Sequence, residues 1–113
     1  MVSQLDLILL SYPFSDLETA KVRPSIVISN DAYNRESQDM IVVPLTTNLS
    51  FRRHAITLTN DELDKGYLIK ESKIKVDRVL SVKQALVRKV IGKVKKEVLT
   101  EITKALLEIV KQT

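Results

Sequence analysis

Two short segments hold the residues whose types and spacing best suit phosphate chemistry. In the first, Arg23 stands just before an apolar, β-branched run that opens after Pro24. In the second, Thr46 and Thr47 stand just after the similar run Ile41–Leu45. If the two runs are neighbouring antiparallel strands, the start of one lies beside the end of the other. A guanidinium and a hydroxyl would then share one edge of a sheet and bind a phosphate together.

A second group of candidate residues is the basic cluster around the single histidine. His54 follows Arg52 and Arg53, with Phe51 directly before them. Histidine is a common proton shuttle, but one histidine excludes a mechanism that needs two. We therefore expect Arg52, Arg53 and His54 to contact a polyanion, with Phe51 stacking on a base. The alternative is a polar hairpin loop without a partner.

The charge distribution agrees with a polyanionic partner. The whole chain carries a net charge of +4. Residues 1–50 hold three basic and six acidic side chains, and residues 51–113 hold fifteen basic and eight acidic ones. A basic region attracts nucleic acid through counterion release. A lysine-rich, solvated surface would give the same counts.

Length and composition predict one domain over residues 1–113 that needs no metal, disulfide or cofactor to fold. The chain has no cysteine, which excludes zinc fingers and thiol catalysis and fits the cytoplasm. No glycine-rich phosphate loop, carboxylate cluster or metal-ligand spacing occurs. The apolar stretch Leu7–Pro13 is too short to span a bilayer, and no basic region precedes it, so we expect neither a membrane segment nor a secretion signal.

The elements that must position these residues are mostly short strands. Leu5–Leu10 is an almost continuous apolar run, which predicts a strand buried on both faces. Asn30–Arg35 is typical of a capped turn, and Met40–Leu45 predicts the next strand. Pro44 lacks a backbone donor, so we expect it on an edge or at a bulge.

The second half predicts further strands and a closing helix. Strands are expected over 55–58, 67–69, 74–79 and 87–94, the last with a bulge or a close backbone approach at Gly92. Asn60–Gly66 has a candidate N-cap, early acids and a stop residue, which predicts a one-turn helix. A helical stripe follows at the C-terminus, through Val98, Ile102, Leu106 and Ile109. The pattern predicts a small antiparallel β protein with a C-terminal helix, of the mainly β, α+β class.

Two motifs in this order resemble the MazF/PemK family of bacterial toxins. The family opens one strand with an arginine and a proline and ends a second with proline, an aliphatic residue and threonine or serine; the matching segments are Arg23–Asp31 and Pro44–Thr46. The likeness extends from Asp6 to the last helix. It implies an SH3-like barrel with a C-terminal helix, the fold of the MazF, Kid and CcdB toxins.

The resemblance also implies an endoribonuclease that cleaves single-stranded mRNA without metal. The ribose 2′-hydroxyl attacks the adjacent phosphate and leaves a cyclic phosphate and a 5′-hydroxyl. Arg23 matches the catalytic arginine, whose donors would stabilise the charge of the transition state. Thr46 matches the catalytic threonine or serine, and Thr47 is its rival if the register shifts by one residue.

Further positions match RNA contacts of the family. Glu18 corresponds to a glutamate in a glycine-rich loop, although the loop of this chain holds no glycine. Asp77 and Arg78 correspond to an acidic–polar pair that reads base edges, with Arg78 in place of the usual glutamine. Asn48, next to Thr47, completes the expected substrate contacts.

The partners implied by the resemblance are single-stranded RNA, a cognate antitoxin protein and a second copy in a homodimer. Operator DNA would be bound only through the antitoxin complex. Two alternatives remain at this point. One is a toxin of the same fold that binds a protein target such as DNA gyrase and cuts nothing, and the other is a catalytically quiet regulator.

Overall fold

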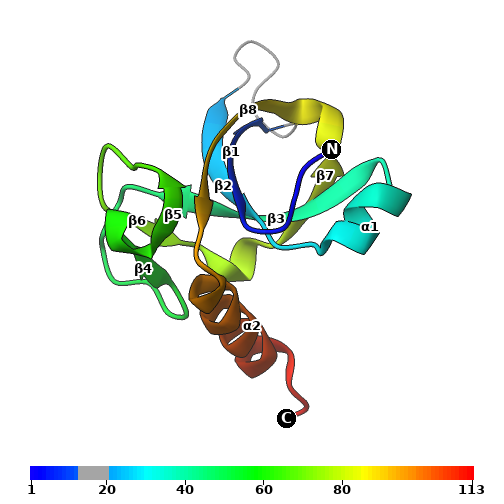
Figure 1. Ribbon diagram of the computed structural model, residues 1–113. Coiled ribbons are helices and arrows are strands. Elements are labelled where there is room, and N and C mark those ends of the chain that lie inside the picture. Colours follow the sequence, from blue (N-terminus) through cyan, green and yellow to red (C-terminus); the bar gives the residue numbers. More distant parts are fainter. Residues whose placement is uncertain (13–20) are drawn as a thin grey trace.

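The computed structural model describes residues 1–12 and 21–113. Within this part of the chain, eight strands build one antiparallel sheet, and helix α2 (Lys96–Val110) follows the last of them (Figure 1). The strand order is β4-β6-β3-β2-β1-β8-β5, and β7 pairs with β3 beside β6. The predicted antiparallel sheet with a C-terminal helix is confirmed.

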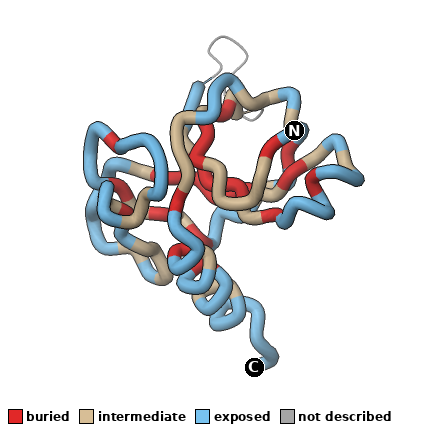
Figure 2. The backbone as a smooth tube through the Cα atoms, viewed as in Figure 1, coloured by how far each residue is buried: buried red, intermediate tan, exposed pale blue. Residues whose placement is uncertain are grey.

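Three central strands, β1 (Asp6–Ser11), β2 (Val22–Val27) and β3 (Asp39–Thr46), are buried on both faces over much of their length, β2 only in its second half. Alternate residues of a strand point to opposite faces of the sheet. A nearly continuous apolar run therefore contributes side chains to a hydrophobic core on each face. One core contains Leu7, Ile26, Val43, Leu45 and, from α2, Val98 and Ile102. The other contains Ile8, Leu10, Val27, Met40 and Val42. Figure 2 shows these buried segments at the centre of the molecule.

Strand β3 changes its neighbour along its length. Its first half pairs with β7 (Leu80–Lys83), and Leu45 and Thr46 pair with β6 (Ser72–Ile74). The expectation that Pro44 lies on an edge is wrong, because Pro44 is buried and pairs with Ser25 of β2. Its carbonyl accepts a hydrogen bond of 2.9 Å from the backbone N–H of Lys75. The N–H and C=O groups of one residue point to the same edge of a strand. On this edge of β3 the partner changes from β7 to β6 near Pro44, so the N–H that proline lacks would have pointed to the point of change.

The segment 60–70 differs from its prediction. A one-turn helix over Asn60–Gly66 was expected, but a 3₁₀ turn, η1 (Asn60–Glu62), is followed by strand β5 (Leu63–Gly66). Thr59, and not Asn60, caps the turn, in a capping box with Glu62. The Asn60 amide instead bonds the backbone N–H and C=O of Leu68, which keeps the predicted strand 67–69 irregular.

The predicted strand 74–79 is also shorter than expected. β6 ends at Ile74, and a 3₁₀ turn, η2 (Val76–Arg78), follows, so Asp77 and Arg78 lie on a turn and not on a strand. Val76 reaches the same core as Ile74, which a strand would also have allowed. The alternation therefore did not distinguish the two conformations. Strand β7 and the turn η3 (Gln84–Leu86) were not predicted.

Strand β8 (Val87–Val94) has the predicted bounds and the predicted bulge. Its register with β1 shifts between Leu7, opposite Gly92, and Ile8, opposite Val90. Gly66 has φ +75° and approaches Gly92 so closely that a Cβ on Gly66 would lie 2.1 Å from the carbonyl oxygen of Ile91. Two elements complete the fold, α1 (Asp31–Glu36), capped by the side chain of Asn30 as expected, and β4 (Ile56–Leu58).

Helix α2 contributes to the core mainly through its first half. Val98 and Ile102 are buried, and Leu106 packs against them, whereas Ile109 and Val110 are exposed. The predicted stripe is therefore confirmed as core only as far as Leu106, and the last turn extends away from the sheet (Figure 1). Neither α1 nor α2, the α-helices of the described residues, combines the length and apolar character that crossing a bilayer requires.

Candidate phosphate-binding pocket

Arg23 and Thr46 lie on the same face of neighbouring strands, at the same end. Ser25 of β2 is paired with Pro44 of β3, at the end of the ladder between the two strands. Arg23 lies two residues before Ser25, and Thr46 lies two residues after Pro44. A spacing of two residues preserves the face. Both side chains therefore lie on the face of Ser25 and Pro44, while Pro24 and Thr47 lie on the other.

A cavity of about 580 Å³ opens around Arg23. We call it the cationic pocket; it is lined by Tyr12, Lys21, Arg23, Pro44, Lys75, Asp77, Arg78, Val79 and Leu80. Four of these residues are cations, and Asp77 is the one acid among them. Such a lining suits an anion with several oxygens, because guanidinium and ammonium groups donate charge-assisted hydrogen bonds to phosphoryl oxygens.

Arg23 is exposed, and within the described residues it forms neither an ion pair nor a hydrogen bond through its side chain. An ion pair of Arg23 with Asp31 or Glu18 is the structural alternative to a role at the site. The pair with Asp31 does not form, and the Asp31 carboxylate accepts a hydrogen bond of 2.8 Å from the backbone N–H of Gln4, while Glu18 lies outside the described residues. Within residues 1–12 and 21–113, the Arg23 guanidinium is therefore available to a ligand in the pocket.

Thr46 is half-buried and does not line the cationic pocket itself. Its Oγ1 accepts a hydrogen bond of 3.1 Å from the backbone N–H of Asn48. That bond uses an oxygen lone pair, so the hydroxyl hydrogen remains for donation. Thr46 also pairs with Lys73 of β6, on the side of β3 away from Arg23. Thr46 therefore lies on β3 between β2, which carries Arg23, and β6, which carries Lys73.

Tyr12 is a pocket residue that the sequence did not reveal. Its hydroxyl lies 2.6 Å from Oγ of Ser25, which is fully buried on β2. Burial raises the pKa of the Tyr12 phenol, while the Ser25 hydrogen bond and the Arg23 charge act in the opposite direction. The phenol therefore stays protonated and forms a polar wall next to Arg23.

Lys75 is the second pocket residue that was missed. Its backbone N–H bonds Pro44, so its side chain enters the pocket across β3 from Arg23. Partial burial lowers the pKa of the Lys75 amine, and the charges of Arg52, Arg23 and Arg78 lower it further, against an opposing effect of Asp77. The sequence held one indication of this position. In Lys73-Ile74-Lys75-Val76, polar and apolar residues alternate, which assigns Lys75 to the polar face of the segment.

Asp77 and Arg52, both expected to contact substrate, contact each other. Nη2 of Arg52 lies 3.2 Å and 3.4 Å from the two carboxylate oxygens of Asp77. The two side chains are 32% and 43% exposed, so the pair is a surface salt bridge worth at most about 1 kcal/mol. Nε of Arg52 is buried without a partner among the described residues. The bridge ties the 47–55 loop to the rim of the pocket.

The other predicted site residues lie apart from this group. Thr47 lines a different, mostly apolar cavity with Pro24 on the opposite face of the sheet. The side chain of Asn48 caps the backbone of Ser50 at 3.0 Å. Arg53 is exposed and His54 has a left-handed backbone with φ 66°, but neither lines the cationic pocket. Glu18 lies outside the described residues.

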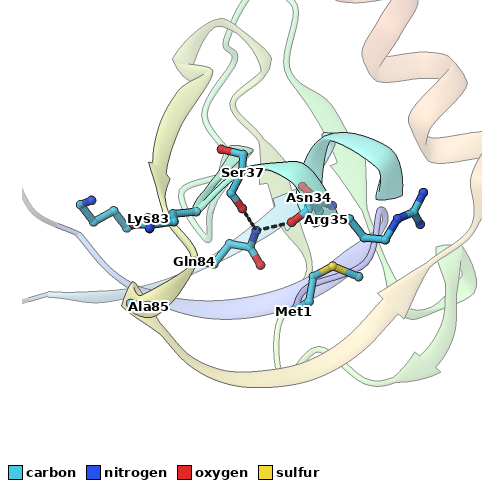
Figure 3. A pocket seen from close by; sticks show the side chains of 8 residues that line it. Met1, Asn34, Arg35, Ser37, Lys83, Gln84 and Ala85 are labelled. Atoms are coloured by element: carbon cyan, nitrogen blue, oxygen red, sulfur yellow. Dashed lines mark hydrogen bonds between the residues drawn. The ribbon is translucent and has the colours of Figure 1, made fainter.

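A further cavity of about 440 Å³, near the N-terminus, is organised by Gln84 (Figure 3). The Gln84 amide nitrogen donates to the carbonyls of Asn34, Ser37 and Asp39, at 2.8, 3.1 and 3.1 Å. Its oxygen accepts from the backbone of Val2 at 3.1 Å. Because these bonds occupy the polar atoms of the side chain, Gln84 joins β7 to the turn before β3 and serves the fold.

The fold and the pocket define a class: a small antiparallel β protein that offers a cationic pocket at the end of two central strands. Residues 3–110 match the family described as PemK-like, MazF-like toxin of type II toxin-antitoxin system. The chain belongs to this family, and the resemblance of Arg23–Asp31 and Pro44–Thr46 is confirmed. No protein of curated function matches the sequence.

Solved structures share the fold over the whole length. MazF from Deinococcus radiodurans superposes with a TM-score of 0.78 at 21% identity, covering 98% of this chain and 97% of that one. MazE–MazF from the same organism gives 0.80 at 18%, covering 99% and 98%. A mycobacterial endoribonuclease in complex with its cognate antitoxin gives 0.78 at 15%, covering 100% and 98%. These superpositions show a common half-barrel fold with a C-terminal helix.

Proposed function

We propose that this protein is a toxin endoribonuclease that cleaves single-stranded mRNA by metal-independent attack of the 2′-hydroxyl on the adjacent phosphodiester. The observation that carries the proposal is the exposed guanidinium of Arg23 in a pocket with four cationic side chains. Two similar mycobacterial proteins of this fold are described as endoribonucleases, which supports the same reaction here.

In the proposed mechanism, Arg23 acts as an electrostatic catalyst. Attack of the 2′-oxygen creates a phosphorane with an additional negative charge, and a guanidinium fork stabilises it with two directed donors. Arg23 is a poor general base, because it stays protonated at neutral pH. The Thr46 hydroxyl donates one further hydrogen bond where charge develops, and the phenol of Tyr12 borders the bound nucleotide.

RNA contacts outside the scissile phosphate are assigned to the pocket rim and the adjacent loop. Arg78 and Asp77 lie beside Arg23, and Asp77 brings Arg52 with it through their ion pair. Arg53, His54 and Asn48 belong to the same exposed loop, on which Phe51 is 90% exposed and suited to stacking on a base. Glu18 and Thr47 remain proposed contacts on sequence grounds.

We infer that the chain acts as a homodimer in the cytoplasm and is neutralised by a cognate antitoxin, which alone carries it to operator DNA. Tyr67, Ile69 and Val90 are exposed around an apolar cavity of about 720 Å³, a surface that suits a protein partner. Complexes of similar toxins with MazE support the antitoxin. Light scattering of the pure protein tests the dimer, and a monomer at micromolar concentration would overturn it.

The test of the nuclease is incubation of purified protein with single-stranded RNA in excess chelator, followed by sequencing of the fragment ends. The expected products carry 2′,3′-cyclic phosphates and 5′-hydroxyls, and the Arg23→Ala variant serves as the control for contaminating nucleases. If RNA stays intact while the wild-type protein inhibits DNA gyrase, the protein is a target-binding toxin instead. Cleavage that persists unchanged in Arg23→Ala would assign the nuclease activity elsewhere.

A further inference from the structure

We propose that Arg78 makes the cationic pocket selective for a guanine beside the scissile phosphate, and that Arg52 secures this selectivity by holding Asp77. The inference rests on the proposed function, because it names the base that is read at the same site. It depends on the side chains that meet at the pocket rim, on the ion pair between two of them, and on the hydrogen-bond pattern of the four bases.

Arg78 is the last residue of η2, a turn that is anchored beside the catalytic strands. The backbone N–H of Arg78 donates to the carbonyl of Lys75 at 3.0 Å, and the N–H of Lys75 donates to the Pro44 carbonyl at 2.9 Å. Val76, the first residue of the same turn, is fully buried in the core. This anchoring holds the Arg78 backbone at the rim of the pocket that also contains Arg23.

The side chain of Arg78 has donors to offer a ligand. Arg78 is exposed, and within the ranges 1–12 and 21–113 its guanidinium forms neither a hydrogen bond nor an ion pair. Arg23, the other guanidinium of the lining, is assigned to the phosphate, so the two groups have different roles. Because both line one cavity, a nucleotide whose phosphate lies on Arg23 places a flanking base next to Arg78.

Among the described residues that line the cationic pocket, Asp77 is the one acid, and Arg52 neutralises it. A single guanidinium nitrogen of Arg52, Nη2, lies 3.2 Å and 3.4 Å from the two carboxylate oxygens. A carboxylate held in this way attracts the amino group of a base less strongly than a free carboxylate does. The rim therefore presents donors to a base, while its acidic acceptor is engaged within the protein.

A rim of donors distinguishes the bases by their acceptors. Guanine presents O6 and N7 side by side, and arginine binds this pair with two parallel hydrogen bonds. Adenine has an amino donor next to N7, and uracil has an N–H between its two carbonyl oxygens, so neither offers this pair. Cytosine offers N3 and O2 but has no N7. In single-stranded RNA these edges are unpaired and open to side chains, so Arg78 favours guanine.

The first experiment sequences the ends of fragments that the wild-type protein cuts from a random pool of single-stranded RNA. We expect guanine to be enriched at one of the two positions that flank the cut. Single-turnover rates are then measured on one oligoribonucleotide with guanosine, 7-deazaguanosine, adenosine or cytidine at that position. Replacing N7 of guanine by carbon, or guanosine by another nucleoside, should slow wild type by about tenfold or more.

Variants of Arg78 test whether this side chain reads the base. Arg78→Ala should cleave the guanosine and 7-deazaguanosine substrates at rates within about threefold of each other, because the N7 contact is lost. Arg78→Gln should lower the ratio of guanosine to adenosine rates by about tenfold or more, since a glutamine amide matches N6 and N7 of adenine. Arg35→Gln, an exposed arginine on α1 outside the pocket, is the matched control and should keep the wild-type ratios.

The Arg52→Gln variant tests the part played by the ion pair. It frees the Asp77 carboxylate, which accepts hydrogen bonds from the amino groups of adenine and cytosine. The ratio of guanosine to cytidine rates should therefore fall by about fivefold or more, whatever happens to the overall rate. Because the ion pair is exposed, its loss should leave the fold intact, as urea unfolding of the same preparation would measure.

Wild-type protein without a guanine preference beside the cut, or an Arg78→Ala protein that still distinguishes guanosine from 7-deazaguanosine, would overturn the role of Arg78. An Arg52→Gln protein with the wild-type ratio would overturn the role of Arg52. If wild type cleaves no RNA, the proposed nuclease function itself is wrong, which is a distinct result. Fluorescence anisotropy with 2′-fluoro oligonucleotides, which lack the nucleophile, then measures the same guanine preference as binding.

Discussion

Replacement of Arg23 by alanine should separate catalysis from stability. The side chain is exposed and makes no hydrogen bond or ion pair within residues 1–12 and 21–113, so its removal should change the free energy of unfolding by no more than about 0.5 kcal/mol. Its loss should slow cleavage by about a hundredfold or more, since one donor at a developing oxyanion contributes about 3 kcal/mol to transition-state stabilisation.

The assay follows cleavage of a fluorescent oligoribonucleotide under single-turnover conditions, beside urea unfolding of the same preparation. Arg35→Ala is the matched control, because Arg35 is an exposed arginine on α1 outside the cationic pocket, and both variants lower the net charge of +4 by one. An equal loss of activity in the two variants would mean that Arg23 acts only through general attraction of the polyanion.

The same variant makes a second measurable change. Arg23 is one of the cations that lower the pKa of Lys75. Removing it should raise that pKa, as a pH titration of the Lys75 amine by NMR would measure. Full activity in a folded Arg23→Ala protein, or a Lys75 titration that is the same in both proteins, would refute this account of the pocket.

Three further outcomes are expected. Thr46→Val should reduce cleavage less than Arg23→Ala does, because it removes one neutral donor, as the same cleavage assay would measure. Ile102→Ala should lower the free energy of unfolding by about 2–5 kcal/mol, because Ile102 is fully buried between α2 and the sheet, as urea unfolding would measure. Gly66→Ala should destabilise by more than about 1 kcal/mol in the same measurement, because the left-handed backbone and the Ile91 carbonyl both oppose a Cβ.

Each of these outcomes has a result that would contradict it. A Thr46→Val protein as slow as Arg23→Ala would make the hydroxyl an equal partner in catalysis. An Ile102→Ala protein of wild-type stability would mean that α2 does not pack on the core in solution. A Gly66→Ala protein of unchanged stability would place β5 farther from β8 than the structure does.

Much of the fold follows from local sequence patterns. The strands β1, β3 and β8 were predicted because each is a long apolar run with few alternatives. A capped turn was predicted over Asn30–Arg35, where the structure has the short helix α1. Most errors fell on 60–86, where segments of three or four residues carry too little periodicity to separate a strand from a 3₁₀ turn. There the Asn60 side chain bonds Leu68, eight residues away, an interaction that no local rule anticipates.

The candidate site was predictable to the extent that two motifs carry it. Arg23 and Thr46 were selected by residue type and by their position next to apolar runs. They lie on one face of the sheet because each is two residues from a member of the pair Ser25–Pro44, and side chains two apart on a strand point the same way. Tyr12 and Lys75 carry no such motif. Each becomes part of the pocket only because β1 and the end of β6 are brought beside β2 and β3.

The sequence by itself determined the class of the protein, the family and the two residues best suited to phosphate, since these depend on residue type and short-range order. The tertiary structure alone decided which charges meet. Arg52 and Asp77 are 25 positions apart and form an ion pair, and Arg23 and Lys75 share one pocket although 52 positions separate them. Electrostatic effects depend on distance in space and on burial, and both arise only when the chain has folded.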